Sequence, residues 1–211
     1  MRLILLLLCF FTSCVQALPG GPGVSTIVID AGHGGEDRGA RAKPPYCEEK
    51  RLCLETARLV KKYLGQLGYH VVMTRNTDAF VSLPQRVEIA NQALGDLFVS
   101  IHYNSSRKTT ANGIEIFFHE NGEKQKKSHS SRRLADSILR RLIRRTSAVS
   151  RGVKKGNFYV IRETSMPAVL VEGGFLSNPE ERSRLRNQEY QEQLARGIAD
   201  GIHLFLKKVH A

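Results

Sequence analysis

The chain has 211 residues, of which 41% are hydrophobic and 25% are charged. A chain of this size and composition forms one compact domain with a hydrophobic core, and it leaves no need for a second domain. The formal net charge of +12 indicates an anionic partner, which could be nucleic acid, a lipid surface or an acidic polymer.

The first 17 residues have the features of a secretion signal. Arg2 supplies a positive charge, and residues 3–11 form an apolar segment that is too short to span a bilayer. Cleavage after Ala17 would free the protein, whereas the residues before Cys14 also resemble a lipoprotein signal. Lipidation of Cys14 would anchor the chain to a membrane. We expect cleavage after Ala17, and export to the periplasm or cell envelope.

The positive charge is unevenly placed, because one predicted helix carries six arginines: Arg132, Arg133, Arg140, Arg141, Arg144 and Arg145. A solvated basic face is the simpler interpretation of such a run. The export signal argues against nucleic acid, as does the lack of interleaved aromatic residues that could stack on bases. We therefore expect the basic surface to meet an anionic polymer of the cell envelope.

Apolar runs alternate with amphipathic segments along the chain. We expect strands at 26–29, 69–74, 97–102, 113–118, 158–161 and 168–171. Helices are expected at 49–67, at 84–94, from about 130 after a lysine-rich loop at 123–127, and at 189–207. This order predicts an α/β fold: a single domain over residues 26–208, with a mostly parallel twisted sheet and helices on both faces.

Two cysteines remain once the signal segment is set aside. Cys53 lies inside a predicted helix and Cys47 lies just before it. A disulfide between them would require their α-carbons to come within about 7 Å of each other through a bend at the helix start. We expect both cysteines to be unpaired.

Three apolar runs each end at a residue that can bind a metal or transfer a proton. They lead to His33, His102 and Glu172, respectively. Ligands of open α/β sheets bind outside the carboxyl ends of the strands, so the three side chains are predicted to share one site.

The residue types at these strand ends suit a catalytic zinc site, which takes three protein ligands and leaves a position for water. His33 and His102 supply nitrogen, and either Glu48 or Glu49, at the start of the first helix, supplies oxygen. Glu172 is placed to act as the general base that activates water. Two glycines follow it and leave room for a substrate.

The same residues resemble the zinc-dependent N-acetylmuramoyl-L-alanine amidases of the amidase 3 family, which act on bacterial cell walls. The resemblance covers about residues 26–206. The segments that carry it are Ile29–Gly35, Asp37, Gly39–Ala40, Glu49–Lys50, Thr74–Asp78, Arg86, Ala90–Asn91, Ser100–Ser105 and Met166–Asn178.

The resemblance implies that His33, Glu49 and His102 bind one Zn²⁺ per chain and that Glu172 is catalytic. The substrate would be peptidoglycan, cleaved between the lactyl group of muramic acid and L-alanine during cell-wall remodelling and cell division. Asn104 is a candidate for substrate contact or for loop structure, and so is Arg75.

This sequence departs from the family pattern in two places. Residues 43–48 replace a glycine-rich stretch before the ligand, so Glu48 competes with Glu49 for the metal, although Glu49 keeps the Glu-Lys pair of the family. Some relatives insert a helix that blocks the zinc, and here only about residues 122–128 occupy that region. We therefore expect activity without relief of self-blocking, and the sequence identifies no activator protein.

Two other functions compete with this prediction. A zinc carboxypeptidase or endopeptidase acting on the stem peptide would use the same metal chemistry. A non-catalytic peptidoglycan-binding protein would keep affinity without turnover, but the retained ligand set and Glu172 argue against it.

Overall fold

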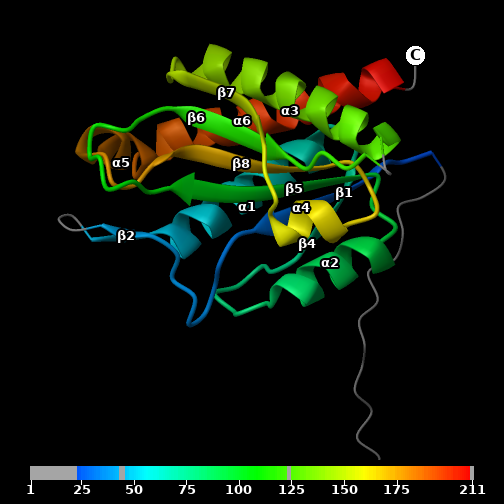
Figure 1. Ribbon diagram of the computed structural model, residues 1–211, viewed down its shortest axis with the longest axis horizontal. Helices are drawn as coiled ribbons and strands as arrows, with labels where there is room; N and C mark the ends of the chain where they lie inside the picture. The colour runs from blue at the N-terminus through cyan, green and yellow to red at the C-terminus, as the bar shows by residue number, and fades with distance from the viewer. Residues whose placement is uncertain (1–22, 43–45, 123–124, 210–211) are drawn as a thin grey trace, which may run out of the picture.

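The computed structural model describes residues 23–42, 46–122 and 125–209 (Figure 1). The predicted signal segment 1–17 lies outside them, so the signal itself, cleavage after Ala17 and lipidation of Cys14 stay predictions. The strands are β1 (Thr26–Ala31), β2 (Arg41–Ala42), β3 (Cys47–Glu48), β4 (His70–Met73), β5 (Leu97–Asn104), β6 (Ile114–Phe118), β7 (Ser150–Lys155) and β8 (Ala168–Phe175). The helices are α1 (Glu49–Gln66), α2 (Leu83–Gln92), α3 (Gln125–Thr146), α4 (Tyr159–Glu163), α5 (Pro179–Leu185) and α6 (Gln188–Val209).

Six strands form one sheet in the order β4-β1-β5-β8-β6-β7. The first four run parallel to one another, whereas β6 runs antiparallel to β8 and β7 follows the direction of β6. The short strands β2 and β3 form a separate antiparallel pair. The predicted single α/β domain with a mostly parallel sheet is confirmed, with a reversal of strand direction between β8 and β6.

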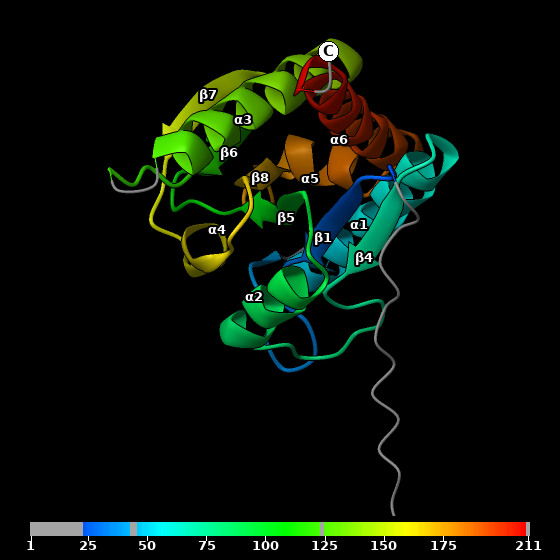
Figure 2. The ribbon, with the colours of Figure 1, turned by 90° about the vertical axis from the view of Figure 1, so that its right-hand side faces the viewer.

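Helices cover both faces of this sheet, as predicted (Figures 1 and 2). Successive strand residues point to opposite faces, so Ile27 and Ile29 enter the core under α1, α3 and α6, while Val28 enters the core under α2 and α4. On the α2 and α4 face, the apolar side chains of β8 end at Leu170, and the next residue on that face is Glu172. The carboxyl-terminal part of this face is therefore polar, and the site lies there.

The two longest helices, α3 and α6, pack closely because α6 carries small residues where they meet. A Cβ atom added at Gly201 would lie 2.4 Å from the Cα of Ile138, and one at Gly197 would lie 3.0 Å from the Cα of Leu142. Glycine at these two positions lets the helix backbones approach closely. Among the described helices, none combines the length and apolar composition that a membrane crossing needs.

Some predicted elements are wrong. The apolar run at 158–161 is not a strand. Phe158 directly precedes a short helix, α4, whose Val160 and Ile161 are buried in the core under α2 and α4. A short apolar run does not show whether its apolar residues repeat with the period of a helix or of a strand. Burial of these residues therefore could not distinguish a helix from a strand in the sequence. Helix α3 begins at Gln125 rather than near residue 130, so the predicted loop at 123–127 is shorter than expected.

The sequence interpretation also missed β2, β3, β7 and α5. The edge strand β7 has the sequence Ser-Arg-Gly-Val-Lys-Lys, in which charged residues replace the expected apolar alternation. Helix α5 begins after Asn178, whose side chain accepts hydrogen bonds from the backbone N–H groups of Glu180 and Glu181. The expected unpaired cysteines are confirmed, because Cys47 and Cys53 are both free and buried.

Candidate metal centre

The first histidine lies in a tight turn just after β1. His33 has φ of 60°, and Gly34 and Gly35 after it also have positive φ. The backbone N–H of Gly34 donates to the carbonyl of Asp37 at 2.8 Å, which closes the turn. The carboxylate of Asp37 lies 2.8 Å from Nδ1 of His33 and orients the ring, so that Nε2 faces Glu49 and His102.

The other two metal-competent side chains come from β5 and from the first residue of α1. The ring of His102 lies against Gly32, where an added Cβ atom would come within 2.3 Å of Cε1 of the ring. Glu49 accepts hydrogen bonds from the backbone N–H of Ala40 at 2.8 Å and of Tyr103 at 3.1 Å. Its carboxylate is therefore fixed beside both histidines.

Three ligand atoms from these residues form a small triangle. Oε1 of Glu49 lies 3.0 Å from Nε2 of His33 and 3.0 Å from Nδ1 of His102, and the two nitrogens are 3.2 Å apart. A tetrahedral ion with ligand bonds of about 2.0–2.1 Å separates its ligand atoms by about 3.3 Å. The triangle has the size that holds such an ion. Among the described residues, His33, Glu49 and His102 form the group of histidine and carboxylate side chains whose ligand atoms lie close enough together to hold a metal ion.

The ionisation of Glu49 also suits metal binding. Burial alone would raise the pKa of Glu49, but hydrogen bonds and charges from His102 and His33 hold that pKa below its usual range. Burial alone would lower the pKa of His33, which Glu49 and Asp37 instead raise. Glu49 is held ionised, as a carboxylate ligand must be.

The alternative ligand, Glu48, faces away from the triangle. Its carboxylate accepts a hydrogen bond from the hydroxyl of Tyr46 and lies 3.4 Å from Nη1 of Arg38. Glu48 and Glu49 are consecutive residues at the junction of β3 and α1, so their side chains diverge. The geometry favours Glu49 as the oxygen donor.

Glu172 lies on β8 directly beside His102 of β5 in the strand register. Its Oε2 is buried and has no hydrogen-bond partner among the described residues. Burial raises its pKa well above the usual range, and the negative charges of Glu49 and Glu115 add to the effect. A buried carboxyl with an unpartnered oxygen beside a metal-competent triangle is placed to accept and return a proton.

A family model for N-acetylmuramoyl-L-alanine amidase matches residues 27–203. The chain belongs to this family. The catalytic domain of CwlV, an amidase from Bacillus (Paenibacillus) polymyxa var. colistinus, has 39% sequence identity and a TM-score of 0.81, and the match covers 87% of this chain and 99% of that domain. Residues 27–203, which match the family model, therefore include all three residues of the triangle.

Two proteins with similar sequences extend the comparison. The YqiI protein of Bacillus subtilis is 40% identical over 189 residues, which cover 90% of this chain and 88% of YqiI. The probable cell wall amidase LytH of Staphylococcus epidermidis is 36% identical over 178 residues, which cover 84% of this chain. The match spans 57% of the length of LytH, so LytH is the longer protein.

The amidase contains a second charged cluster, which the sequence interpretation missed. Glu115 on β6 lies opposite Glu172 in the antiparallel register. Its Oε2 accepts hydrogen bonds from Arg151 at 2.8 Å and Lys154 at 2.5 Å, both on β7, and its Oε1 accepts one from Asn104 at 2.7 Å. Because the sequence pattern did not predict β7, it could not place Arg151 and Lys154 beside the site.

The two candidates for substrate contact differ in their surroundings. The guanidinium of Arg75 donates to the carbonyls of Ala31, Gly32, Lys50 and Thr77 at 2.6–3.0 Å, and its side chain is buried. These bonds join the end of β1 to the start of α1, which favours the loop-structure alternative for Arg75. Asn104 is half-buried at the end of β5 and is held by Glu115, so it lies at the site itself.

A buried ion pair supports the turn that carries His33. Asp30 accepts hydrogen bonds from Thr74 and Ser100 at 2.6 Å and from Nη1 of Arg86 at 2.7 Å. Arg86 also donates to the carbonyls of Ala31 at 2.6 Å and His33 at 2.7 Å. Burial alone would raise the pKa of Asp30, but Arg86 and the hydroxyls hold it below its usual range.

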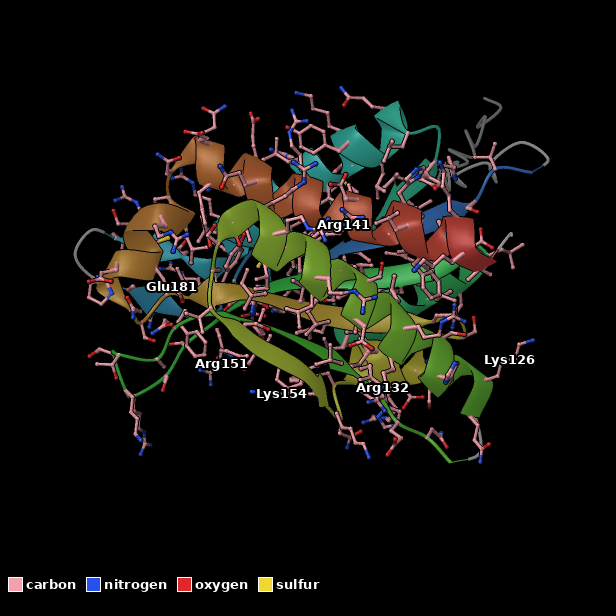
Figure 3. All side chains as sticks on the ribbon, turned by 90° about the horizontal axis from the view of Figure 1, so that it is seen from above. Lys126, Arg132, Arg141, Arg151, Lys154 and Glu181 are labelled. Carbon is pink, nitrogen blue, oxygen red and sulfur yellow. The ribbon has the colours of Figure 1, made fainter. Side chains whose placement is uncertain are left out.

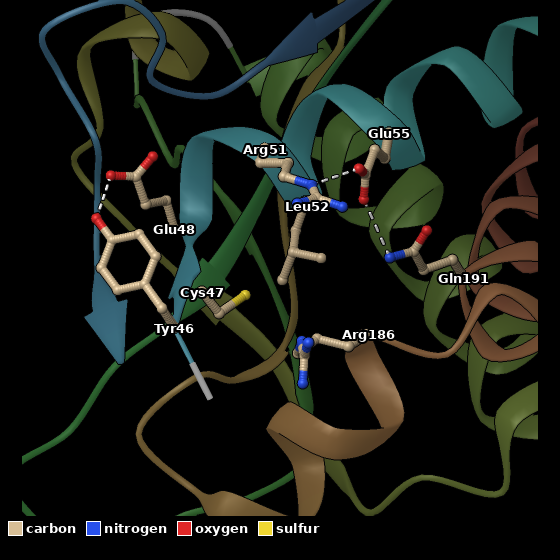
Figure 4. A pocket seen from close by; sticks show the side chains of 8 residues that line it. All are labelled: Tyr46, Cys47, Glu48, Arg51, Leu52, Glu55, Arg186 and Gln191. Atoms are coloured by element: carbon tan, nitrogen blue, oxygen red, sulfur yellow. Dashed lines mark hydrogen bonds and ion pairs between the residues drawn. The ribbon is translucent and has the colours of Figure 1, made fainter. Parts of the chain in front are cut away.

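Two cavities lie near these residues. One of about 120 Å³ opens beside the triangle and is lined by His33, His102, Phe80, Leu83 and Val160, among others. Another, of about 200 Å³, lies beyond Glu48 at the start of α1, between Tyr46, Cys47, Arg51 and Arg186 (Figure 4). The second holds none of the triangle residues, so we place the chemistry at the first.

Proposed function

We propose that this amidase is zinc-dependent and cleaves the amide bond between the lactyl group of N-acetylmuramic acid and L-alanine in peptidoglycan. The observation that carries the proposal is the triangle of His33, Glu49 and His102 with the unpartnered Oε2 of Glu172 beside it. Two histidines and one carboxylate form a common ligand set of catalytic zinc.

In the proposed mechanism, His33, Glu49 and His102 hold the ion, and Asp37 keeps the ring of His33 in the orientation that presents Nε2. When bound, Zn²⁺ acts as a Lewis acid that polarises the amide carbonyl and lowers the pKa of water. Glu172 accepts a proton from the attacking water and passes it to the departing amine. Its raised pKa suits a group that both takes and returns a proton.

The basic surface supports an anionic substrate without identifying it. Helix α3 carries the six arginines noted in the sequence, and its charges lie along the outside of the molecule, as Arg132 and Arg141 illustrate (Figure 3). A positive surface raises the local concentration of an acidic polymer. Cell-wall relatives further support an exported or envelope protein, in line with the predicted signal segment.

We further propose that this enzyme works without relief of a blocking helix. Strand β6 ends at Phe118 and α3 begins at Gln125, so only a short connection occupies that region. A purified chain of residues 18–211 should hydrolyse murein alone. If activity required a second protein, another form of gating would operate.

The decisive experiment combines product masses with metal content. Purified murein treated with the enzyme should release stem peptides that begin with L-alanine. Peptides shortened at their carboxyl ends, or cleaved internally, would identify a peptidase instead. Affinity for murein without any product would identify a binding protein.

Variants then separate the roles of the residues. Glu172→Gln should keep zinc, measured by elemental analysis, while turnover falls by roughly 10²–10⁴-fold. His102→Ala and Glu49→Gln should lose zinc and activity together, whereas Glu48→Gln, the matched control, should lose neither. A zinc-free Glu172→Gln protein would make Glu172 a ligand, and a fully active one would mean that another group is the base.

A further inference from the structure

A row of polar side chains crosses one face of the sheet from the triangle to the sheet edge. His102 of β5 is in register with Glu172 of β8, which is in register with Glu115 of β6. Residues in register across paired strands point to the same face. Arg151 and Lys154 of β7 complete the row through their bonds to Glu115.

The two cations keep donors free after binding Glu115. Arg151 uses Nε for Glu115 and Nη1 for the carbonyl of Asn112 at 3.2 Å, which leaves Nη2 without a hydrogen bond among the described residues. The ammonium group of Lys154 has three N–H bonds, of which Glu115 accepts one. Their side chains are 35% and 40% exposed, on the edge strand β7 (Figure 3).

The cluster carries a net positive charge. Arg151 and Lys154 together outweigh Glu115 by one charge. The free donors of the two cations would therefore attract an anionic group of the substrate at β7. Arg151 is also held against the ring of Phe175, 4.8 Å from its centroid, so its guanidinium has a defined position.

We infer that Arg151 and Lys154 bind a free carboxylate on the peptide side of the substrate, and that they favour stem peptides in which this carboxylate is not amidated. The inference rests on the proposed function, because it assumes that the cleaved bond lies at the triangle.

The spacing of the strands indicates which peptide residue carries that group. Neighbouring strands lie about 4.8 Å apart, so β7 is about 10 Å from β8 and about 14 Å from β5, which carries His102 of the triangle. An extended peptide advances by about 3.3–3.6 Å per residue. The carboxylate therefore belongs to the third or fourth residue after the cleaved bond.

The test uses two muramoyl peptides that differ only in whether this carboxylate is free or a carboxamide. The wild-type enzyme should hydrolyse the carboxylate form with the higher kcat/KM. Lys154→Gln should reduce that preference by about tenfold, as expected for loss of a charged hydrogen bond. The loss should come through KM for the carboxylate form, with little change for the carboxamide form.

Lys155→Gln is the matched control. Lys155 is the next residue of β7, its side chain is 66% exposed, and it pairs with Glu120 instead of Glu115. The control should keep the wild-type preference. A merely structural role for Lys154 would lower the rates of both substrates equally and would overturn the inference, as would equal rates for the two substrates with the wild-type enzyme.

Binding separates this inference from the proposed function. If the wild-type enzyme hydrolyses neither substrate, calorimetry with both compounds still reports the preference. Tighter binding of the carboxylate form, lost in Lys154→Gln, would support the carboxylate site while refuting the amidase reaction. Equal binding of the two compounds would overturn the carboxylate site as well.

Discussion

The Asp30–Arg86 pair is predicted to be the main electrostatic support of the metal centre. Its side chains are 1% and 4% exposed, and Arg86 donates to the carbonyl of His33 in the same arrangement. Asp30→Asn removes the negative charge and leaves the guanidinium buried with only neutral acceptors. We expect this change to destabilise the fold and to loosen the turn that carries His33.

The magnitude follows from burial. Breaking a buried, hydrogen-bonded ion pair costs about 3–5 kcal/mol, and the retained amide oxygen of asparagine places this variant near the lower end. For a domain of this size, about 3 kcal/mol lowers the melting temperature by roughly 6–12 °C. The matched control is Asp200→Asn. Asp200 pairs with Arg145 at 2.6 Å, but these side chains are 35% and 38% exposed, so the loss should be at most about 1 kcal/mol.

The assay is thermal and denaturant unfolding of both variants at neutral and acidic pH. The pKa of Asp30 is lower in the folded than in the unfolded chain, so its contribution to stability is complete above the unfolded pKa of about 4. The contribution is lost as the pH falls through the folded pKa. The difference between wild type and Asp30→Asn should therefore shrink under acid. Equal melting temperatures of the two variants at neutral pH would refute the reasoning.

Three further predictions follow from local geometry. Gly201→Ala should lower the free energy of unfolding by about 1–3 kcal/mol through overpacking against Ile138, whereas Gly65→Ala, in a helix with nothing within 4 Å, should be neutral or stabilising by up to about 1 kcal/mol. Asp37→Ala should weaken zinc affinity by about 10–100-fold in a competition titration with a chelator, and Glu36→Ala should not. Chelation should abolish murein hydrolysis by the wild type, and added Zn²⁺ should restore it.

The sequence was most informative where a polar residue ends an apolar run. His33, His102 and Glu172 each end an apolar run, and the parallel arrangement of β1, β5 and β8 brings those ends together. Local pattern alone left Glu48 and Glu49 as alternatives. Their separation depends on the direction of each side chain at the β3–α1 junction, which residue spacing does not specify.

Elements with weak periodicity could not be predicted in the same way. Helix α4 is short, and its buried Val160 and Ile161 are as compatible with a strand as with a helix. Strand β7 has an exposed, charged sequence because it lies at the sheet edge, where Lys and Arg discourage pairing with another chain. Its role emerges only from its pairing with β6.

The reversal of strand direction at β6 explains why the site contains residues that no strand-end pattern could reveal. Parallel strands bring the residues that follow an apolar run to the carboxyl edge, as with His102 and Glu172. An antiparallel strand brings its beginning there instead. Glu115 is the second residue of β6 and lies opposite Glu172 for this reason. In a mixed sheet, polar residues near the start of an antiparallel strand are therefore also candidates for the site.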